Sequence, residues 1–204
     1  MEQTMKKIIL FTTLFLMFPV LLMAACAAPS APSAQPSSPE TTSSASDKNV
    51  AVQIDSSVLA DPWKLEDFSD IADMKNYLFY YSNPDAKNAY ITMTQADHYD
   101  DRSDDLKQEL ERNVDTYINQ TLKGSMKESA ATEPSYYEID GYPAVAFDVT
   151  GRLQDGSETF TARTVFVATD KKIYCLQLQD SADHFSQSAG LFDRVKDSLH
   201  IAES

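Results

Sequence analysis

SYYEIDGYPAVAFDVTGRLQDGSETFTARTVFVATDKKIYCLQLQ, residues 135–179, carries the clearest structural pattern in the chain. β-Branched, aromatic and aliphatic residues fall into four segments separated by short polar turns, which is typical of β-strands. Connections this short join neighbouring antiparallel strands. The stretch therefore predicts a four-stranded antiparallel meander. Its strands are Ser135–Ile139, Pro143–Arg152, Glu158–Ala168 and Ile173–Gln179, and its turns lie at 140–141, 154–156 and 170–172.

Two further strands are predicted before the meander, at Tyr77–Tyr81 and Ala89–Thr94. Tyr77–Tyr81 (YLFYY) is apolar on both alternating faces, and such a strand is usually covered on both. We therefore expect helices on each side of the sheet. Upstream, Val50–Leu59 begins as an alternating strand, and Lys64–Met74 has the spacing of a short helix or turn.

Apolar residues at helical spacing predict two helices. The first covers Ser103–Lys123, with Ser103 as its N-cap. The second covers Ala182–His200 and is capped by Asp180 or Ser181. The expected fold class is therefore α+β, an antiparallel β-sheet flanked by helices.

The N-terminus has the pattern of an export signal. Lys6 and Lys7 precede an uncharged, largely apolar run, which predicts a signal peptide over residues 1–25. The run ends in Met23-Ala24-Ala25-Cys26, which resembles the lipobox of bacterial lipoproteins, although Met23 stands where that box usually has Leu. The resemblance implies that Cys26 receives a palmitate-containing diacylglycerol and becomes the new N-terminus. The alternative is an uncleaved transmembrane anchor, because the run is near the minimum length for spanning.

Both alternatives put the rest of the chain on the extracytoplasmic face of the cell membrane, because basic residues keep the start of the chain inside. Residues 26–48 combine Cys26 with a Ser/Pro/Ala tether that is too poor in apolar residues to fold. Residues 49–204 have the length of a single domain. Lipoproteins kept in the inner membrane of diderm bacteria resemble one another in having Asp after the cysteine. Ala27 therefore permits an outer-membrane destination if the envelope is diderm.

The chain is strongly acidic, with 17 Lys and Arg against 31 Asp and Glu and a net charge of −14. Nucleic-acid binding depends on basic residues that neutralise phosphates. We therefore expect no nucleic-acid partner. Negative charge also repels anionic lipid, so the expected membrane contact is through the N-terminal lipid.

Four short stretches of the domain carry a family resemblance. They are Asp61-Pro62-Trp63 after the first strand, Gly141-Tyr142-Pro143-Ala144 at the opening of the meander, Ile173-Tyr174-Cys175-Leu176, and Phe192–Leu199. With the order of elements, they resemble the PsbP-like and DcrB-like family, whose members form an α-β-α sandwich. The resemblance implies that fold and a role in binding other proteins, and it supplies no shared catalytic residues.

The most charged stretch is Asp97–Asp105 (DHYDDRSDD), which could supply carboxylates to a cation. It fails the EF-hand spacing, because Leu106 stands where Gly is required and Arg112 where the bidentate Glu belongs. A solvated helix start is the simpler interpretation, since acids are favoured there. A weak cation site and a partner surface are the alternatives.

The remaining candidates for chemistry favour structural roles. Cys175 lies in a predicted strand, which favours core packing. His98, His184 and His200 lack metal-ligand spacing. The sequence contains neither a Gly-rich phosphate loop nor a nucleophilic-serine motif. We therefore expect no cofactor, no metal ion and no catalytic residue.

The leading hypothesis is a membrane-anchored, extracytoplasmic lipoprotein that acts as a protein-binding or adaptor module of the cell envelope and is not an enzyme. Tyr136, Tyr137 and Tyr142 lie near a turn and could form an exposed recognition patch. One alternative is a small-molecule or divalent-cation-binding lipoprotein. Another is a cell-surface hydrolase with a site assembled from distant residues.

Overall fold

The computed structural model describes residues 50–203, with gaps at 69–70, 72–73, 87, 124–125 and 154–157. The described residues all belong to one compact unit of the chain, Ala45–Ser204. The predicted signal peptide, Cys26, the tether and the turn at 154–156 therefore lie outside the described residues.

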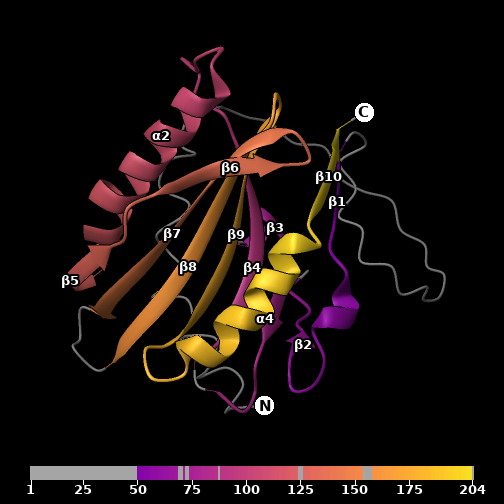
Figure 1. The fold of residues 1–204 in the computed structure, drawn as a ribbon, viewed down its shortest axis with the longest axis vertical. Coiled ribbons are helices and arrows are strands. Elements are labelled where there is room, and N and C mark those ends of the chain that lie inside the picture. The colour runs from indigo at the N-terminus through magenta and orange to yellow at the C-terminus, as the bar shows by residue number, and fades with distance from the viewer. Residues whose placement is uncertain are drawn as a thin grey trace. The chain divides into compact units, whose positions relative to one another are not determined.

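An eight-stranded antiparallel sheet forms the centre of the described part (Figure 1). Its strand order is β2-β3-β4-β9-β8-β7-β5, and β6 pairs with β7 along the same edge as β5. The predicted meander is confirmed as β6 to β9, and the two strands before it as β3 and β4. The strands are β2 (Lys64–Leu65), β3 (Tyr77–Ser82), β4 (Tyr90–Asp97), β5 (Met126–Ala131), β6 (Ser135–Ile139), β7 (Tyr142–Leu153), β8 (Thr159–Ala168) and β9 (Lys172–Ser181).

Side chains of the central strands alternate between two buried faces. Val165 on β8 and Leu176 on β9 belong to one hydrophobic core, whereas their neighbours Phe166 and Cys175 belong to another. Successive side chains of a strand point to opposite faces of the sheet. A core therefore lies on each side of the sheet, and each needs a cover.

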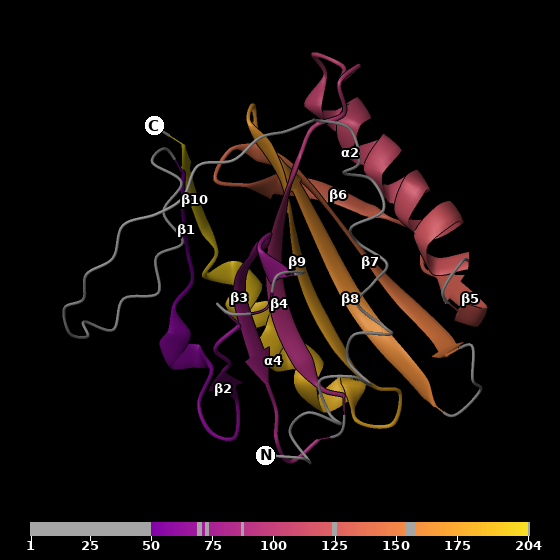
Figure 2. The same ribbon diagram turned by 180° about the vertical axis from the view of Figure 1, so that it is seen from behind.

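One helix covers each face. α4 (Phe185–Asp197) contributes Phe192 and Val195 to the core that contains Val165, and α2 (Leu106–Thr116) contributes Leu110 to the other. Figure 1 shows α4 in front of the sheet, and in the reverse view of Figure 2 the strands lie in front of α4. The expected fold class, α+β with an antiparallel sheet flanked by helices, is confirmed.

The first helix begins later than predicted. The expected cap, Ser103, lies outside it, and the Asp105 carboxylate accepts a hydrogen bond from the Lys107 backbone N–H at 2.9 Å. A carboxylate at this position satisfies one of the unpaired N–H groups of the first turn. Beyond Thr116 the chain continues as a π-helical segment, η4 (Tyr117–Leu122).

The last helix is shorter than the predicted Ala182–His200. The expected caps, Asp180 and Ser181, do not cap it. Instead, the buried Asp180 carboxylate accepts from the Ser188 hydroxyl at 2.6 Å and so ties α4 to β9. The helix ends at Asp197, and the chain then forms a strand that helical spacing alone does not predict.

That last strand, β10 (His200–Glu203), pairs with β1 (Val50–Gln53) in a separate two-stranded sheet. Asp140 ties the pair to the β6–β7 hairpin, because its Oδ2 accepts from the Ile201 backbone N–H at 2.7 Å. Asp140 and Gly141 both have positive φ, at 52° and 81°. An Asp-Gly pair suits such a tight hairpin turn.

The segment between β1 and β3 forms short turns, one of the two alternatives expected there, and the strand predicted to begin at Val50 is confirmed as β1. The first strand ends at Gln53 and a single 3₁₀ turn, η2 (Ser56–Val58), follows. Lys64–Leu65 form the edge strand β2 and not the start of a helix. The sequence pattern also misses β5 (MKESAA), which lies at the sheet edge and has mostly exposed side chains without an apolar alternation.

We expect Phe192→Ala to lower the free energy of unfolding by about 3–5 kcal/mol, because truncating a fully buried aromatic ring leaves a cavity. Urea denaturation followed by circular dichroism would measure it. Leu65→Ala is the control, since Leu65 is 46% exposed and should change stability by less than about 0.5 kcal/mol. Equal losses in the two variants would contradict the assignment of the core.

Candidate functional site

The acidic stretch Asp97–Asp105 follows β4 and leads into α2. Three of its carboxylates have partners within the fold: Asp105 caps α2, Asp97 lies 2.6 Å from Lys172 Nζ, and Asp101 lies 2.8 Å from Arg112 Nη1. Within the described ranges, no group of three or more His, Cys, Asp or Glu side chains is arranged to hold a metal ion. The stretch is thus a helix start held by ion pairs.

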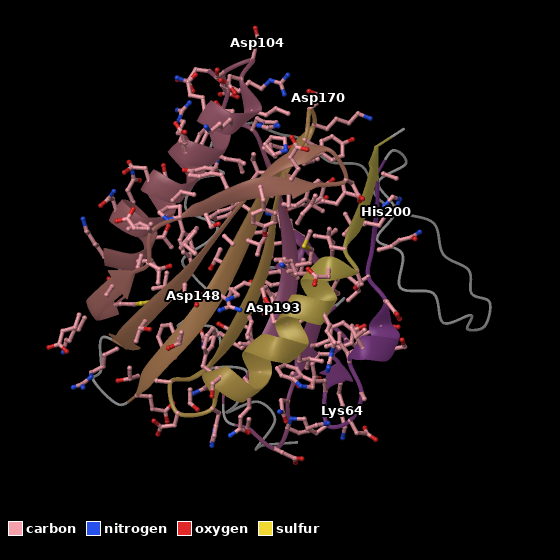
Figure 3. The ribbon with its side chains drawn as sticks, in the orientation of Figure 1. Lys64, Asp104, Asp148, Asp170, Asp193 and His200 are labelled. Atoms are coloured by element: carbon pink, nitrogen blue, oxygen red, sulfur yellow. The ribbon has the colours of Figure 1, made fainter. Side chains whose placement is uncertain are left out.

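Two further bonds fasten this loop to the turn between β8 and β9. His98 Nε2 lies 2.7 Å from the carbonyl oxygen of Thr169, and Arg102 donates from Nη1 to the carbonyl oxygen of Asp170. Figure 3 shows Asp104 and Asp170 at the same end of the sheet. Side chains distant in sequence therefore fix the conformation of the acidic loop.

A buried carboxylate lies beneath the loop. Glu109, in the first turn of α2, is 1% exposed, and its Oε1 accepts from the Ser103 backbone N–H at 2.7 Å. Its Oε2 has no hydrogen-bond partner within the described part of the chain and lies 3.9 Å from His98 Nδ1. Burying a carboxylate is costly unless it has partners, so a nearby cation would offset part of that cost.

Arg112 is one such cation. Its guanidinium lies 2.8 Å from Asp101 Oδ1 and stacks over the Tyr99 ring at 4.0 Å from the centroid. The hydrogen bond that the Arg112 guanidinium donates to Asp101 raises the pKa of that guanidinium, and Glu109 acts in the same direction. Cation–π contact and ion pairing both stabilise a guanidinium here.

A shallow surface depression lies beside Arg112. Besides Arg112, the charged residues that line it are Asp101, Glu109, Glu111 and Asp115. The depression therefore combines four carboxylates with one guanidinium. It is the concave, strongly charged feature that the fold builds from the acidic loop and α2.

Cys175 is buried in the core on the α2 side, as expected. Burial raises the pKa of its thiol to about 12, and a hydrogen bond with Thr94 opposes this in part. A thiol with so high a pKa is not a nucleophile near neutral pH. The histidines lie apart: His184 contacts Ser181, and His200 lies 2.8 Å from Asp140.

The expected tyrosine patch does not form. Tyr136 is 44% exposed, but Tyr137 and Tyr142 are half-buried against the core on the α4 side. Tyr136 points to the opposite face from Tyr137, because the two are neighbours on one strand. Tyr136 alone is well exposed, beneath Lys107 at 5.6 Å from its ring centroid.

Other tyrosines lie in the interior. Gln177 on β9 donates from Nε2 to the Tyr117 hydroxyl at 2.8 Å and to Thr164 Oγ1 at 3.0 Å. Tyr80 and Tyr90 stack with their ring centroids 5.9 Å apart. Burial raises the pKa of Tyr117 to about 12 and that of Tyr90 well above its usual value. The hydroxyls of these tyrosines therefore stay protonated at neutral pH, and the rings contribute to packing in the interior.

The sequence does not predict an ion-pair cluster that lies on the α4 side of the sheet. Arg163 on β8 binds Asp148 on β7 through two bonds of 2.8 and 3.0 Å, and its Nη1 donates to Asp193 on α4 at 3.1 Å. Figure 3 shows Asp148 and Asp193 on β7 and α4. The signal in the sequence is a charged residue at an inward-facing position of a strand, since Arg163 shares the face of Val165.

No helix in the described part of the chain has both the length and the apolar character needed to cross a membrane.

We expect Cys175 to resist alkylation in the folded protein. In the full chain with Cys26→Ala, Cys175 is the one remaining thiol. With its pKa raised to about 12, only a very small fraction of the thiol is ionised at pH 8. Iodoacetamide at pH 8 should therefore react about a thousandfold more slowly with the folded than with the urea-unfolded chain. Similar rates in both states would contradict the burial of Cys175.

Double-mutant cycles should separate the two partners of Arg163. Asp148 makes a bidentate contact and is 26% exposed, whereas Asp193 is 48% exposed. Coupling to Arg163→Met should be about 1–2 kcal/mol for Asp148→Asn and about 0.5 kcal/mol for Asp193→Asn, because solvent screens the second pair. Urea denaturation measures both, and a larger coupling to Asp193 would overturn this ranking.

Comparison with known proteins gives likenesses of structure. No protein-family model and no curated protein matches the sequence. Similar solved structures include cyanobacterial PsbP (CyanoP) from Synechocystis, with 11% identity over 79% of this chain and 98% of that chain at a TM-score of 0.49. LpqN, involved in cell envelope biogenesis of Mycobacterium tuberculosis, has 16% identity over 78% and 87% of the two chains at 0.49. A Pseudomonas aeruginosa protein of unknown function has 14% identity over 58% and 76% at 0.47. At these values the likenesses carry no statement about what this chain binds or does.

Proposed function

We propose that this chain is an extracytoplasmic lipoprotein that binds a protein partner in the cell envelope. The observation that carries the proposal is the order of its segments. An export signal ends in Ala24-Ala25-Cys26, a Ser/Pro/Ala tract follows, and the described domain begins with β1 at Val50. This order suits a folded module held near a membrane by a lipid and a spacer.

The pairing of charged side chains within the domain supports a binding role more than a hydrolytic one. The groups that the fold brings together are mainly paired with one another, as in Asp97 with Lys172, Asp101 with Arg112 and Asp140 with His200. A hydrolytic site would need an acid, a base or a nucleophile held ready for a substrate. The one buried thiol is kept protonated.

Metabolic labelling with palmitate tests the anchor. We expect label on the wild-type chain and none on Cys26→Ala, because the lipid is attached to that thiol. Cys175→Ala is the matched control: it removes the other cysteine and should keep the label. Label that persists in Cys26→Ala would contradict the lipoprotein assignment.

Crosslinking in the native membrane, followed by affinity capture, tests the adaptor role. We expect a stoichiometric envelope protein with the wild-type chain and its loss with Cys26→Ala, because the anchor confines the domain near that partner. Capture without any stoichiometric protein, under conditions where the lipidated chain is recovered, would contradict the adaptor role and favour a small-molecule ligand.

A further inference from the structure

We propose that the depression on the outer face of α2 binds a basic segment, carrying Lys or Arg side chains, of the protein partner. The proposal rests on the proposed adaptor function and names the chemistry of its partner. It is argued from the charge balance of the depression, from a cation that the site already holds, and from a buried carboxylate that lines it.

The depression carries an excess of negative charge. Four carboxylates line it, and Arg112 is the basic residue among the lining side chains. The basic side chains of α2 and its C-terminal extension already have partners. Lys107 lies over the Tyr136 ring, Arg112 is paired with Asp101, and Lys123 donates to the Asn119 side chain.

Of the acids that line the depression, Glu111 and Asp115 make no ion pair with a described residue, and Asp115 accepts a hydrogen bond from the Asn119 side chain at 2.5 Å. They are exposed, and they lie four residues apart on α2, so they are neighbours on one helix face. Like charges at this spacing destabilise a helix by a few tenths of a kcal/mol. A basic side chain placed between them would turn this repulsion into attraction.

Arg112 demonstrates that the site holds a cation. Its guanidinium is bound by the Asp101 carboxylate and by the face of the Tyr99 ring. A second guanidinium or ammonium arriving from solvent would meet two more carboxylates of the same depression, Glu111 beside Arg112 and Asp115 three residues after it. Carboxylates thus bind a cation at one part of the depression and are available to another beside it.

Glu109 is an observation independent of the exposed acids. It lines the depression while being 1% exposed, and its Oε2 accepts no hydrogen bond from a described residue and lies 3.9 Å from His98 Nδ1. Its charge reaches the depression, since Glu109 contributes to the raised pKa of Arg112. A buried charge is screened by solvent much less than an exposed one, so Glu109 strengthens the field that an incoming cation meets.

The test uses the full-length chain in detergent micelles and a fluorescent octalysine peptide as the probe. Fluorescence anisotropy at low salt would give the dissociation constant. Glu111→Lys with Asp115→Lys should weaken binding about tenfold, because two attractive sites become repulsive. Asp85→Lys with Asp183→Lys makes the same change of net charge at exposed turns away from α2 and should weaken binding less than about threefold.

A neutral pair, Glu111→Gln with Asp115→Asn, keeps the test valid if the reversal disturbs the helix. It should show an intermediate loss, with thermal unfolding unchanged. Equal losses in the α2 and control variants would overturn the proposal, because binding would then follow net charge alone. Absence of octalysine binding to the wild-type chain at low salt would overturn it as well.

The native crosslinking experiment separates this proposal from the adaptor role. If the Glu111→Lys, Asp115→Lys chain still captures the wild-type partner in full yield, the adaptor role stands and this surface is not its docking site. If the wild-type chain captures no partner, the adaptor role itself fails. Loss of the partner in the α2 variant, with its retention in the Asp85 and Asp183 control, is the result expected here.

Discussion

Burial of β8 and β9 on both faces is the constraint on which the rest of the domain depends. Val165 and Phe166 are adjacent, point to opposite sides and are both withdrawn from water. Apolar surface on both sides of a sheet has to be covered on both sides. α4 and α2 supply that cover from opposite faces, and the short hairpins between strands leave only the longer connections free to carry them. The sandwich therefore follows from the sequence of β8 and β9, in which neighbouring residues point to opposite faces and both are apolar.

The position of α2 in turn organises the acidic end of the sheet. For the helix to lie over β7 and β8, the chain leaving β4 must turn back across the β8–β9 turn. The bonds of His98 to Thr169 and of Asp97 to Lys172 fix that turn. Charges that would otherwise repel one another are thereby paired. Glu111 and Asp115, on the outer face of α2, make no ion pair with a described residue, and together with Asp101 and Glu109 they give the depression there its acidic character.

The contrast between Arg163 and Arg112 clarifies how the domain uses its few basic residues. Arg163 joins β7, β8 and α4, so it contributes to the cohesion of the fold. Arg112 holds the acidic loop against α2 at the surface. The sequence does not predict either ion pair. Asp148 lies 15 positions from Arg163 and Asp101 lies 11 positions from Arg112, and neither separation is that of neighbours on a helix or across a tight turn. Only the register of β7 against β8 places Asp148 opposite Arg163.

The sequence by itself determined the meander, the two strands before it, the approximate span of both helices and the burial of Cys175, because each of these follows from a local periodicity of apolar residues. The sequence also predicts the cellular location, through the expected lipidation of Cys26. The tertiary structure decided the rest: the β1–β10 pair, the edge strand β5, the true cap at Asp105 and the pairing of the acids in 97–105. These depend on contacts between residues far apart in the chain, and Asp140 holding Ile201 is one example. Long-range pairing is set by the packing of the whole domain, and no local pattern encodes it.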